Sequence, residues 1–225
     1  MLGPAVERLR LAFSRGEEVK YLGHLDLTRL WVRALRRARL PLYYSHGYSP
    51  HPRLSFAAPL AVGITSQAEL LDVYLARRVS PRYFLQAVVP QLPSGVDVLG
   101  VEEVALSAPA LQALVRFAEY QVTFETLGVE SIAPDGPSRI SERLTALLSC
   151  ATLPRERLRD GQLRAYDLRP LVADLWLDKW SPGRATLGMR LVTGSQAAGR
   201  PEEVLAALGW ADVTASFHRT RLVLG

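Results

Sequence analysis

Residues 6–39 read VERLRLAFSRGEEVKYLGHLDLTRLWVRALRRAR, and the spacing of the apolar side chains changes within this stretch. Over residues 6–14 apolar and polar side chains alternate, which predicts a β-strand. From His24 to Arg39 the apolar residues recur at helical spacing, which predicts an amphipathic helix with its arginines on the opposite face. Pro41 cannot extend this helix because proline lacks an N–H. The chain therefore opens with a strand, a turn and a helix.

The residues that follow complete an α+β pattern. Prolines exclude a helix over residues 42–60, and the pattern predicts extended segments at residues 42–45, 53–57, 69–75 and 96–104. A second helix is expected over residues 80–92, with Ser80 as its cap and Pro81 at its first position. With the two short segments within residues 42–57 taken as one strand, the order of elements is strand, helix, strand, strand, helix, strand, which is typical of the split βαβ units of ferredoxin-like folds.

The second part of the chain repeats this order of elements without repeating any sequence motif. Strands are expected at residues 115–125, 165–176, 185–192 and 213–224, the second of them bent at Pro170, and helices at residues 138–151 and 201–208. We therefore predict the fold class α+β, with two tandem ferredoxin-like (βαββαβ) halves, residues 1–108 and 109–225, packed into one compact unit. A single large α+β sheet is the alternative.

The composition is that of a globular protein. Of the 225 residues, 48% are hydrophobic and 22% are charged, which argues against disorder. No apolar run approaches the roughly 20 residues of a membrane span, and the first residues lack the pattern of a signal peptide. We therefore expect a cytoplasmic protein without a membrane partner. The one cysteine, Cys150, is expected to be buried in a helix and cannot form an internal disulfide.

Positive charge is concentrated in the first quarter of the chain. The net charge is +5, and residues 1–60 hold ten basic residues against four acidic ones, a local excess of +6. Three of the four histidines and four of the eight tyrosines lie there too. A basic region with aromatic residues indicates an anionic partner, with nucleic acid first. A merely solvated surface, or one that docks an acidic protein, fits the same charges.

Two segments hold most of the histidines and tyrosines, residues 21–26 (YLGHLD) and residues 43–53 (YYSHGYSPHPR). The second is a loop stiffened by prolines, which could hold rings against nucleotide bases, while the amides at the helix start could receive a phosphate. The predicted residues for binding RNA or a protein partner are His24, Arg29, Arg33, Arg36, Arg37, Tyr44, His46, Tyr48, His51 and Arg53. We further expect His24, Tyr48, His51 and Arg53 to converge at one partly open site; the alternative is that His51 packs on Tyr48 and only closes the turn.

Catalysis and metal binding are weaker interpretations of the same residues. Histidine titrates near neutral pH, so His24 could act in acid–base chemistry on RNA with Tyr21 or Lys20 stabilising charge. The histidine spacing matches no standard metal site, and no phosphate-binding glycine motif occurs. The sequence therefore favours a module without cofactors, metal or catalytic activity of its own.

The segment from Tyr21 to Leu75 resembles the signature of a radical-SAM-associated family of unassigned function. The resemblance is close over residues 8–75 and looser elsewhere; Gly23 and Tyr48 depart from it, standing where the family usually has Ser and Phe. The matching positions are His24, Leu25, Asp26, Leu40, Pro41, Tyr44, Ser45, Gly47, Pro50, His51, Pro52, Ser55, Phe56, Gly63, Ser66 and Glu69.

Members of that family occur fused to, or encoded beside, cobalamin-type radical SAM proteins, so the resemblance implies such a partner in trans. With one cysteine the chain lacks a three-cysteine cluster motif, so radical chemistry would reside in another polypeptide.

Three functions stay open at this point. The first is an RNA- or nucleoprotein-binding accessory module of a radical SAM enzyme. The second is a pure protein-interaction subunit whose arginine helix docks that enzyme. The third is a metal-independent endoribonuclease using His24; a weaker, fold-level likeness to CRISPR repeat-processing endoribonucleases supports it, although their glycine-rich C-terminal loop is absent here.

Overall fold

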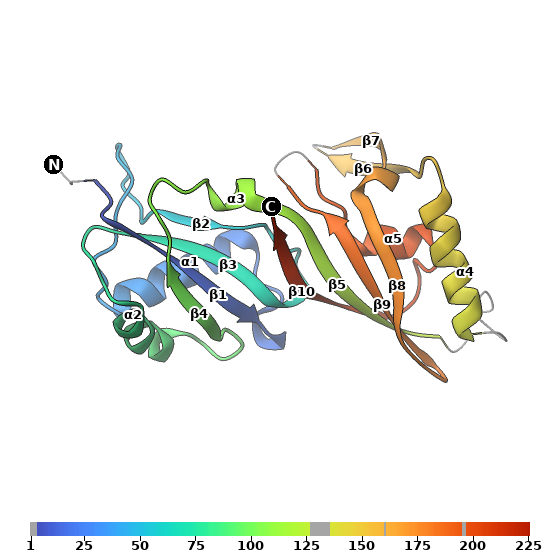
Figure 1. The fold of residues 1–225 in the computed structure, drawn as a ribbon, viewed down its shortest axis with the longest axis horizontal. Coiled ribbons are helices and arrows are strands. Elements are labelled where there is room, and N and C mark those ends of the chain that lie inside the picture. Colours follow the sequence, from blue (N-terminus) through green and yellow to red (C-terminus); the bar gives the residue numbers. More distant parts are fainter. Residues whose placement is uncertain (1–3, 127–135, 160, 195–196) are drawn as a thin grey trace. The chain divides into compact units, whose positions relative to one another are not determined.

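The computed structural model describes residues 4–126, 136–159, 161–194 and 197–225. The chain divides into two compact units, Met1–Val115 and Arg116–Gly225. Both are of the α+β class, with mostly antiparallel strands and few helices (Figure 1). The division falls one residue after the end of α3 (Leu111–Leu114).

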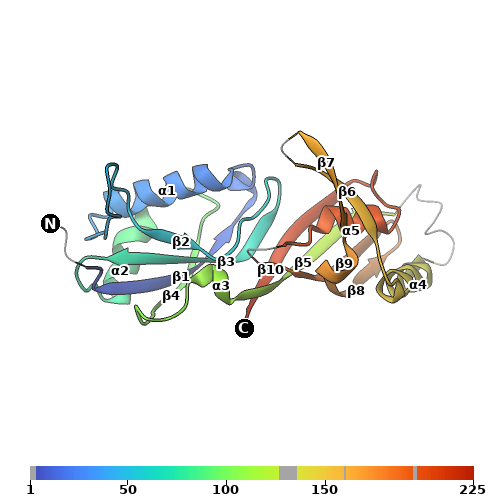
Figure 2. The same ribbon diagram turned by 90° about the horizontal axis from the view of Figure 1, so that it is seen from above.

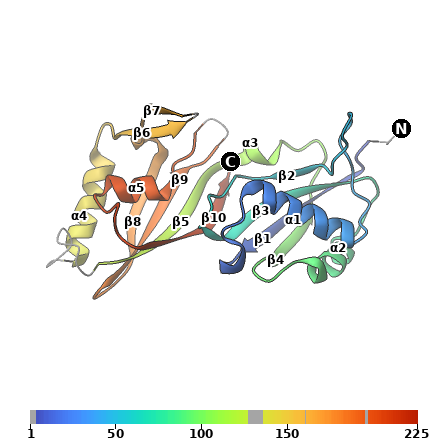
Figure 3. The same cartoon turned by 180° about the vertical axis from the view of Figure 1, so that it is seen from behind.

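The first unit is one antiparallel sheet with helices on one face. Its strands lie in the order β4-β1-β3-β2, and β1 pairs with both β3 and β4. In Figure 3 α1 and α2 lie in front of this sheet. The elements are β1 (Glu7–Arg15), α1 (His24–Arg37), β2 (Leu54–Phe56), β3 (Thr65–Leu75), α2 (Pro81–Val88) and β4 (Val98–Glu103), with short 3-10 turns η1 (Glu17–Val19) and η2 (Val89–Gln91).

Alternation along β1 decides which side chains enter the core. Leu9, Leu11 and Phe13 are fully buried and face the helices, where the Phe13 and Trp31 rings meet edge to face with centroids 5.0 Å apart. The intervening residues point to the opposite face of the sheet. The amphipathic pattern of α1 therefore packs its apolar side against β1 and leaves its arginines exposed.

Both ends of α1 follow from local chemistry. Gly23 precedes the helix and offers no side-chain cap. At the other end Arg39 has a φ of 54°, and its neighbour Leu40 donates from its N–H to the Leu35 carbonyl, which closes the last turn. Pro41 then prevents further helix.

The second unit has strands in the order β10-β5-β9-β8, with β9 antiparallel to both β5 and β8. A separate antiparallel hairpin, β6-β7, is inserted before β8. The elements are β5 (Val115–Glu125), α4 (Gly136–Ser149), β6 (Pro154–Arg159), β7 (Gln162–Asp167), the 3-10 turn η3 (Arg169–Leu171), β8 (Val172–Ser181), β9 (Arg184–Val192), α5 (Pro201–Ala207) and β10 (Ala215–Leu224).

Several local expectations are corrected by the structure. Residues 42–45 form only isolated bridges, Leu42 to Leu75 and Tyr44 to Pro52, because prolines on both sides limit pairing. The expected strand at 165–176 is two strands separated by η3 at Pro170, and the β6-β7 hairpin was not expected. Cys150 is exposed and follows the end of α4. None of the helices in the described ranges is both long and apolar enough to span a membrane.

Candidate functional site

Arg15 holds the segment that leads into α1. Its side chain is only 1% exposed, and its guanidinium donates to the carbonyls of Val19, Lys20, Leu22 and Leu60. One buried cation thus satisfies the backbone of the turn between β1 and α1 and connects it to the chain after β2. The Gly63 N–H donates to the Lys20 carbonyl at 2.8 Å and fixes the same connection.

The three candidates for catalysis lie together around this turn. The Lys20 ammonium donates to Glu17 at 2.6 Å, which raises the pKa of Lys20 above its ordinary value, and it lies 5.2 Å from the centre of the Tyr21 ring. Lys20 therefore stays cationic near neutral pH and cannot act there as a base. The His24 ring meets Phe56 edge to face at 5.2 Å, so its position is set by packing.

The loop of residues 43–53 is shaped by its own side chains. The Tyr43 hydroxyl lies 2.9 Å from His46 Nε2, and the Ser45 hydroxyl lies 3.1 Å from His51 Nδ1 and accepts from the His51 N–H. Tyr48 stands at the tip, fully exposed. His51 thus closes the loop through Ser45, not by packing on Tyr48.

This loop docks on the end of α1 remote from His24. Arg36, in the last turn of α1, donates to the Tyr44 hydroxyl at 3.3 Å, and Arg53 lies over the Tyr74 ring at 4.3 Å. Twelve residues of helix separate His24 from Arg36, which corresponds to about 18 Å. Figure 2 shows the light-blue loop beside one end of α1, while the chain enters the helix at the other. The structure does not bring His24 together with Tyr48, His51 and Arg53.

The arginines of α1 differ in their partners. Arg29 donates to Asp26 at 2.9 Å, whereas Arg37 donates to the Gln91 carbonyl at 2.6 Å. Beyond Arg29, no arginine on this helix or around the loop forms an ion pair with a carboxylate in the described part of the chain. We call the exposed arginines at the C-terminal end of α1 and beside it, which have no carboxylate partner among the described residues, the basic end. They are Arg33, Arg36, Arg37, Arg39, Arg53 and Arg77.

Arg77 is the member that sequence reasoning missed. It follows β3, and the adjacent Ala76 donates from its N–H to the Pro41 carbonyl at 2.7 Å, which places Arg77 near the end of α1. The Arg-Arg pair at 77–78 after a predicted strand was the available signal.

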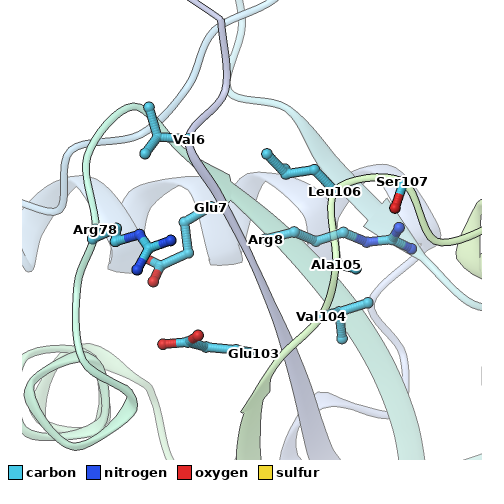
Figure 4. A pocket seen from close by; sticks show the side chains of 9 residues that line it. All are labelled: Val6, Glu7, Arg8, Arg78, Glu103, Val104, Ala105, Leu106 and Ser107. Atoms are coloured by element: carbon cyan, nitrogen blue, oxygen red, sulfur yellow. The ribbon is translucent and has the colours of Figure 1, made fainter.

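A hollow of about 520 Å³ lies at the same edge of the sheet (Figure 4). The Arg78 guanidinium points toward Glu7 there, with Glu103 close by. Glu7 is buried and accepts the Val79 N–H at 2.8 Å, so it caps the approach to α2. Arg78 faces the carboxylates of Glu7 and Glu103, which offset its charge, so it does not belong to the basic end.

Within the described residues, no three histidine, cysteine, aspartate or glutamate side chains gather as a metal site would require. The site offers cations, tyrosines and histidines, and this chemistry fits an anion with aromatic parts.

The chain belongs to a family described as an uncharacterized protein conserved in bacteria (DUF2344), whose model matches residues 8–201. No protein with a curated description matches the sequence. Among solved structures, it is similar to a chain in a Cbf5-Nop10-Gar1 complex, at 11% identity over 95% of this chain and 48% of that chain, with a TM-score of 0.47.

A chain in an H/ACA RNP bound to a substrate RNA containing 2'-deoxyuridine gives 11% identity over 96% of this chain and 47% of that chain, also with a TM-score of 0.47. An unknown protein from Galdieria sulphuraria matches at 12% identity and a TM-score of 0.27, with coverage of 95% and 98%. The chain spans about half the length of the first two proteins.

Proposed function

We propose that this protein is an RNA-binding accessory module and that RNA phosphates contact the basic end of its first unit. The observation that carries the proposal is the set of arginines there that no carboxylate neutralises among the described residues. An isolated arginine on a solvated surface needs no partner, but several from separate segments at one end create a local positive potential. Arg33 and Arg36 come from α1, Arg53 precedes β2 and Arg77 follows β3.

Aromatic side chains at the same end position two of these arginines. Tyr44 and Tyr74 each lie beneath a guanidinium, Arg36 at 5.8 Å and Arg53 at 4.3 Å from the ring centres. These contacts hold the arginines in place, which reduces the entropy lost when they bind a phosphate. We also propose that the module acts in the cytoplasm, together with its proposed RNA and enzyme partners.

Reversing two of these charges is expected to weaken RNA binding strongly. In Arg33→Glu/Arg36→Glu, affinity for a mixed RNA should fall at least tenfold at low salt. The slope of log affinity against log salt should become shallower by about 1.4–1.8, since each phosphate contact contributes about 0.7–0.9. Filter binding across a salt series measures both quantities.

Arg29→Glu is the matched control, because Arg29 lies on the same helix but already pairs with Asp26. Its effect on RNA affinity should be small. Equal losses in the two variants would indicate general electrostatic attraction, and no RNA binding by the unmodified protein at low salt would end the RNA proposal.

A cobalamin-type radical SAM protein is the proposed protein partner, through the family resemblance. A specific surface favours its docking at the other end of α1. We call it the apolar patch: Tyr21, Leu25 and Val62 are 72%, 68% and 55% exposed, and the Gly63–Lys20 hydrogen bond brings their segments together. Exposed apolar side chains that adjoin one another are typical of protein interfaces.

Leu25→Asp is therefore expected to abolish co-purification with the proposed radical SAM partner. A buried aspartate in the interface would have no partner for its charge. Leu106→Asp, at an exposed leucine of the same unit, is the control. If instead Arg33→Glu/Arg36→Glu prevents co-purification and Leu25→Asp does not, the enzyme docks on the arginine helix and the pure interaction module gains support.

We also propose that the two units are tandem ferredoxin-like folds, and their strand order supports this. Numbering four sheet strands of each unit in chain order, with β6 and β7 set aside as an insertion, gives the spatial order 4-1-3-2 in both. A helix follows the first strand and another precedes the fourth in each unit. This is the connectivity of two split βαβ units.

A further inference from the structure

Trp176 occupies an unusual place on the second unit's sheet. It projects from β8, and its indole lies directly over Gly188 of β9, where any Cβ would overlap the ring. Trp176 nevertheless stays 37% exposed. A glycine inside a strand marks a place where another group must approach the backbone closely, and here it lets the indole lie flat against the sheet.

The face that carries Trp176 is the one that α5 does not cover. Val122 and Leu187 are buried on the core side, and their neighbours Gln121 and Thr186 point the opposite way by alternation. Helix α5 lies behind β8 and β9 in Figure 1 and in front of them in Figure 3. The face with Trp176 is thus the one turned toward the viewer in Figure 1.

A hollow of about 610 Å³ lies near this face, and Trp176 is not among the residues that line it. Gln121 lines the hollow and stands opposite Gly188 in the strand register. The hollow therefore begins next to the strand position that the indole covers. Trp180 lines the hollow together with polar and cationic side chains. These are Gln121, Thr123, Ser181, Thr186, Lys179 and Arg184.

The polar groups of the hollow are partly organised in advance. The Gln121 amide donates to Asp178 at 3.0 Å, which fixes the side chain and leaves its carbonyl oxygen as an acceptor. The Thr123 and Thr186 hydroxyls lie 2.9 Å apart. Neither Lys179 nor Arg184 forms an ion pair with a described carboxylate, although Glu125 stands opposite Arg184 in the register.

We propose that this sheet face is a second RNA-binding site that takes unpaired nucleotides of single-stranded RNA. A base stacks on the exposed indole of Trp176, Gln121 and the threonines meet the edge of a base, and Lys179 and Arg184 contact phosphates. An aromatic ring on an open sheet with hydrogen-bonding and basic neighbours supplies the two interactions that unpaired nucleotides need. The inference rests on the proposed RNA-binding function only for the identity of the polymer.

The test uses the full chain and a short unstructured oligouridylate, with a duplex RNA of equal length for comparison. Two of the four tryptophans, Trp31 and Trp210, are buried. Of the other two, Trp180 lines the hollow and Trp176 lies beside it on the sheet, so quenching of tryptophan fluorescence by the oligonucleotide should come from both rings and be reduced in Trp176→Phe. Fluorescence anisotropy with labelled RNA should show about a tenfold loss of oligouridylate affinity in Trp176→Ala, a smaller loss in Trp176→Phe, and little change for the duplex.

Tyr83→Ala, at an exposed ring on α2, is the matched control and should bind as the unmodified protein does. Lys179→Gln/Arg184→Gln keeps the indole and should reduce oligouridylate affinity with a shallower salt dependence, so the proposal stays testable if Trp176→Ala folds poorly. Unchanged affinity in both Trp176→Ala and Lys179→Gln/Arg184→Gln overturns the second site. If the second site is overturned but RNA affinity still falls in Arg33→Glu/Arg36→Glu, the proposed RNA-binding function stands.

Discussion

Replacing Asp72 by alanine is expected to destabilise the first unit by about 3–5 kcal/mol, because it leaves buried guanidinium charge without its partner. Asp72 is fully buried on β3, and both Arg8 and Arg10 of β1 donate to its carboxylate. Arg8, 1% exposed, also donates to the carbonyls of Ala108 and Pro109 and so fastens the chain before α3 to the sheet.

The measurement is hydrogen exchange of peptides from β1 and β3, with urea denaturation of the same variants. Asp26→Ala is the control, since the Asp26–Arg29 pair is exposed and such pairs contribute at most about 1 kcal/mol. Exchange in Asp72→Ala as slow as in the unmodified protein would mean that solvent reaches Arg8 and Arg10 and compensates their charge.

The periodic segments of the chain could be predicted from sequence. Residues 6–14 alternate, and β1 spans Glu7–Arg15. The apolar face of residues 24–39 predicted α1, which ends at Arg37 because Arg39 adopts a positive φ ahead of Pro41. The periodic spacing of apolar residues shows which face of a strand or helix is buried in the core, so these elements can be predicted from sequence.

The sites could be predicted only in part, since they depend on distances between separate segments. His24 and the 43–53 loop flank α1 in sequence, but the length of the helix keeps them at opposite ends. Arg77 reaches the basic end through a backbone bond between Ala76 and Pro41, which no local pattern encodes. Trp176 is a candidate binding residue because its indole lies over Gly188 on the adjacent strand. This pairing depends on the strand register, which exists only in the folded sheet.

Arg15→Ala is expected to release the turn between β1 and α1 and to cost about 3 kcal/mol or more. The carbonyls of Leu22 and Leu60 lose the guanidinium donor, and each buried carbonyl left unsatisfied costs about 1–3 kcal/mol. The carbonyls of Val19 and Lys20 lose it too, but they keep the N–H groups of Leu22 and Gly63 as donors. Residues 17–24 should then exchange amide hydrogens much faster, while β4 should change little.

Arg15→Lys separates charge from geometry. Lysine keeps the cation, but its donors lie on one nitrogen and cannot spread over four carbonyls as the planar guanidinium does. It should restore only a minor part of the lost protection, and Arg33→Ala, on the exposed face of α1, should cost almost nothing. Because Tyr21 and Leu25 border this turn, Arg15→Ala should also weaken co-purification with the proposed radical SAM partner. Full protection of residues 17–24 in Arg15→Ala would show that packing around Val19 and Leu27, not the guanidinium, holds the turn.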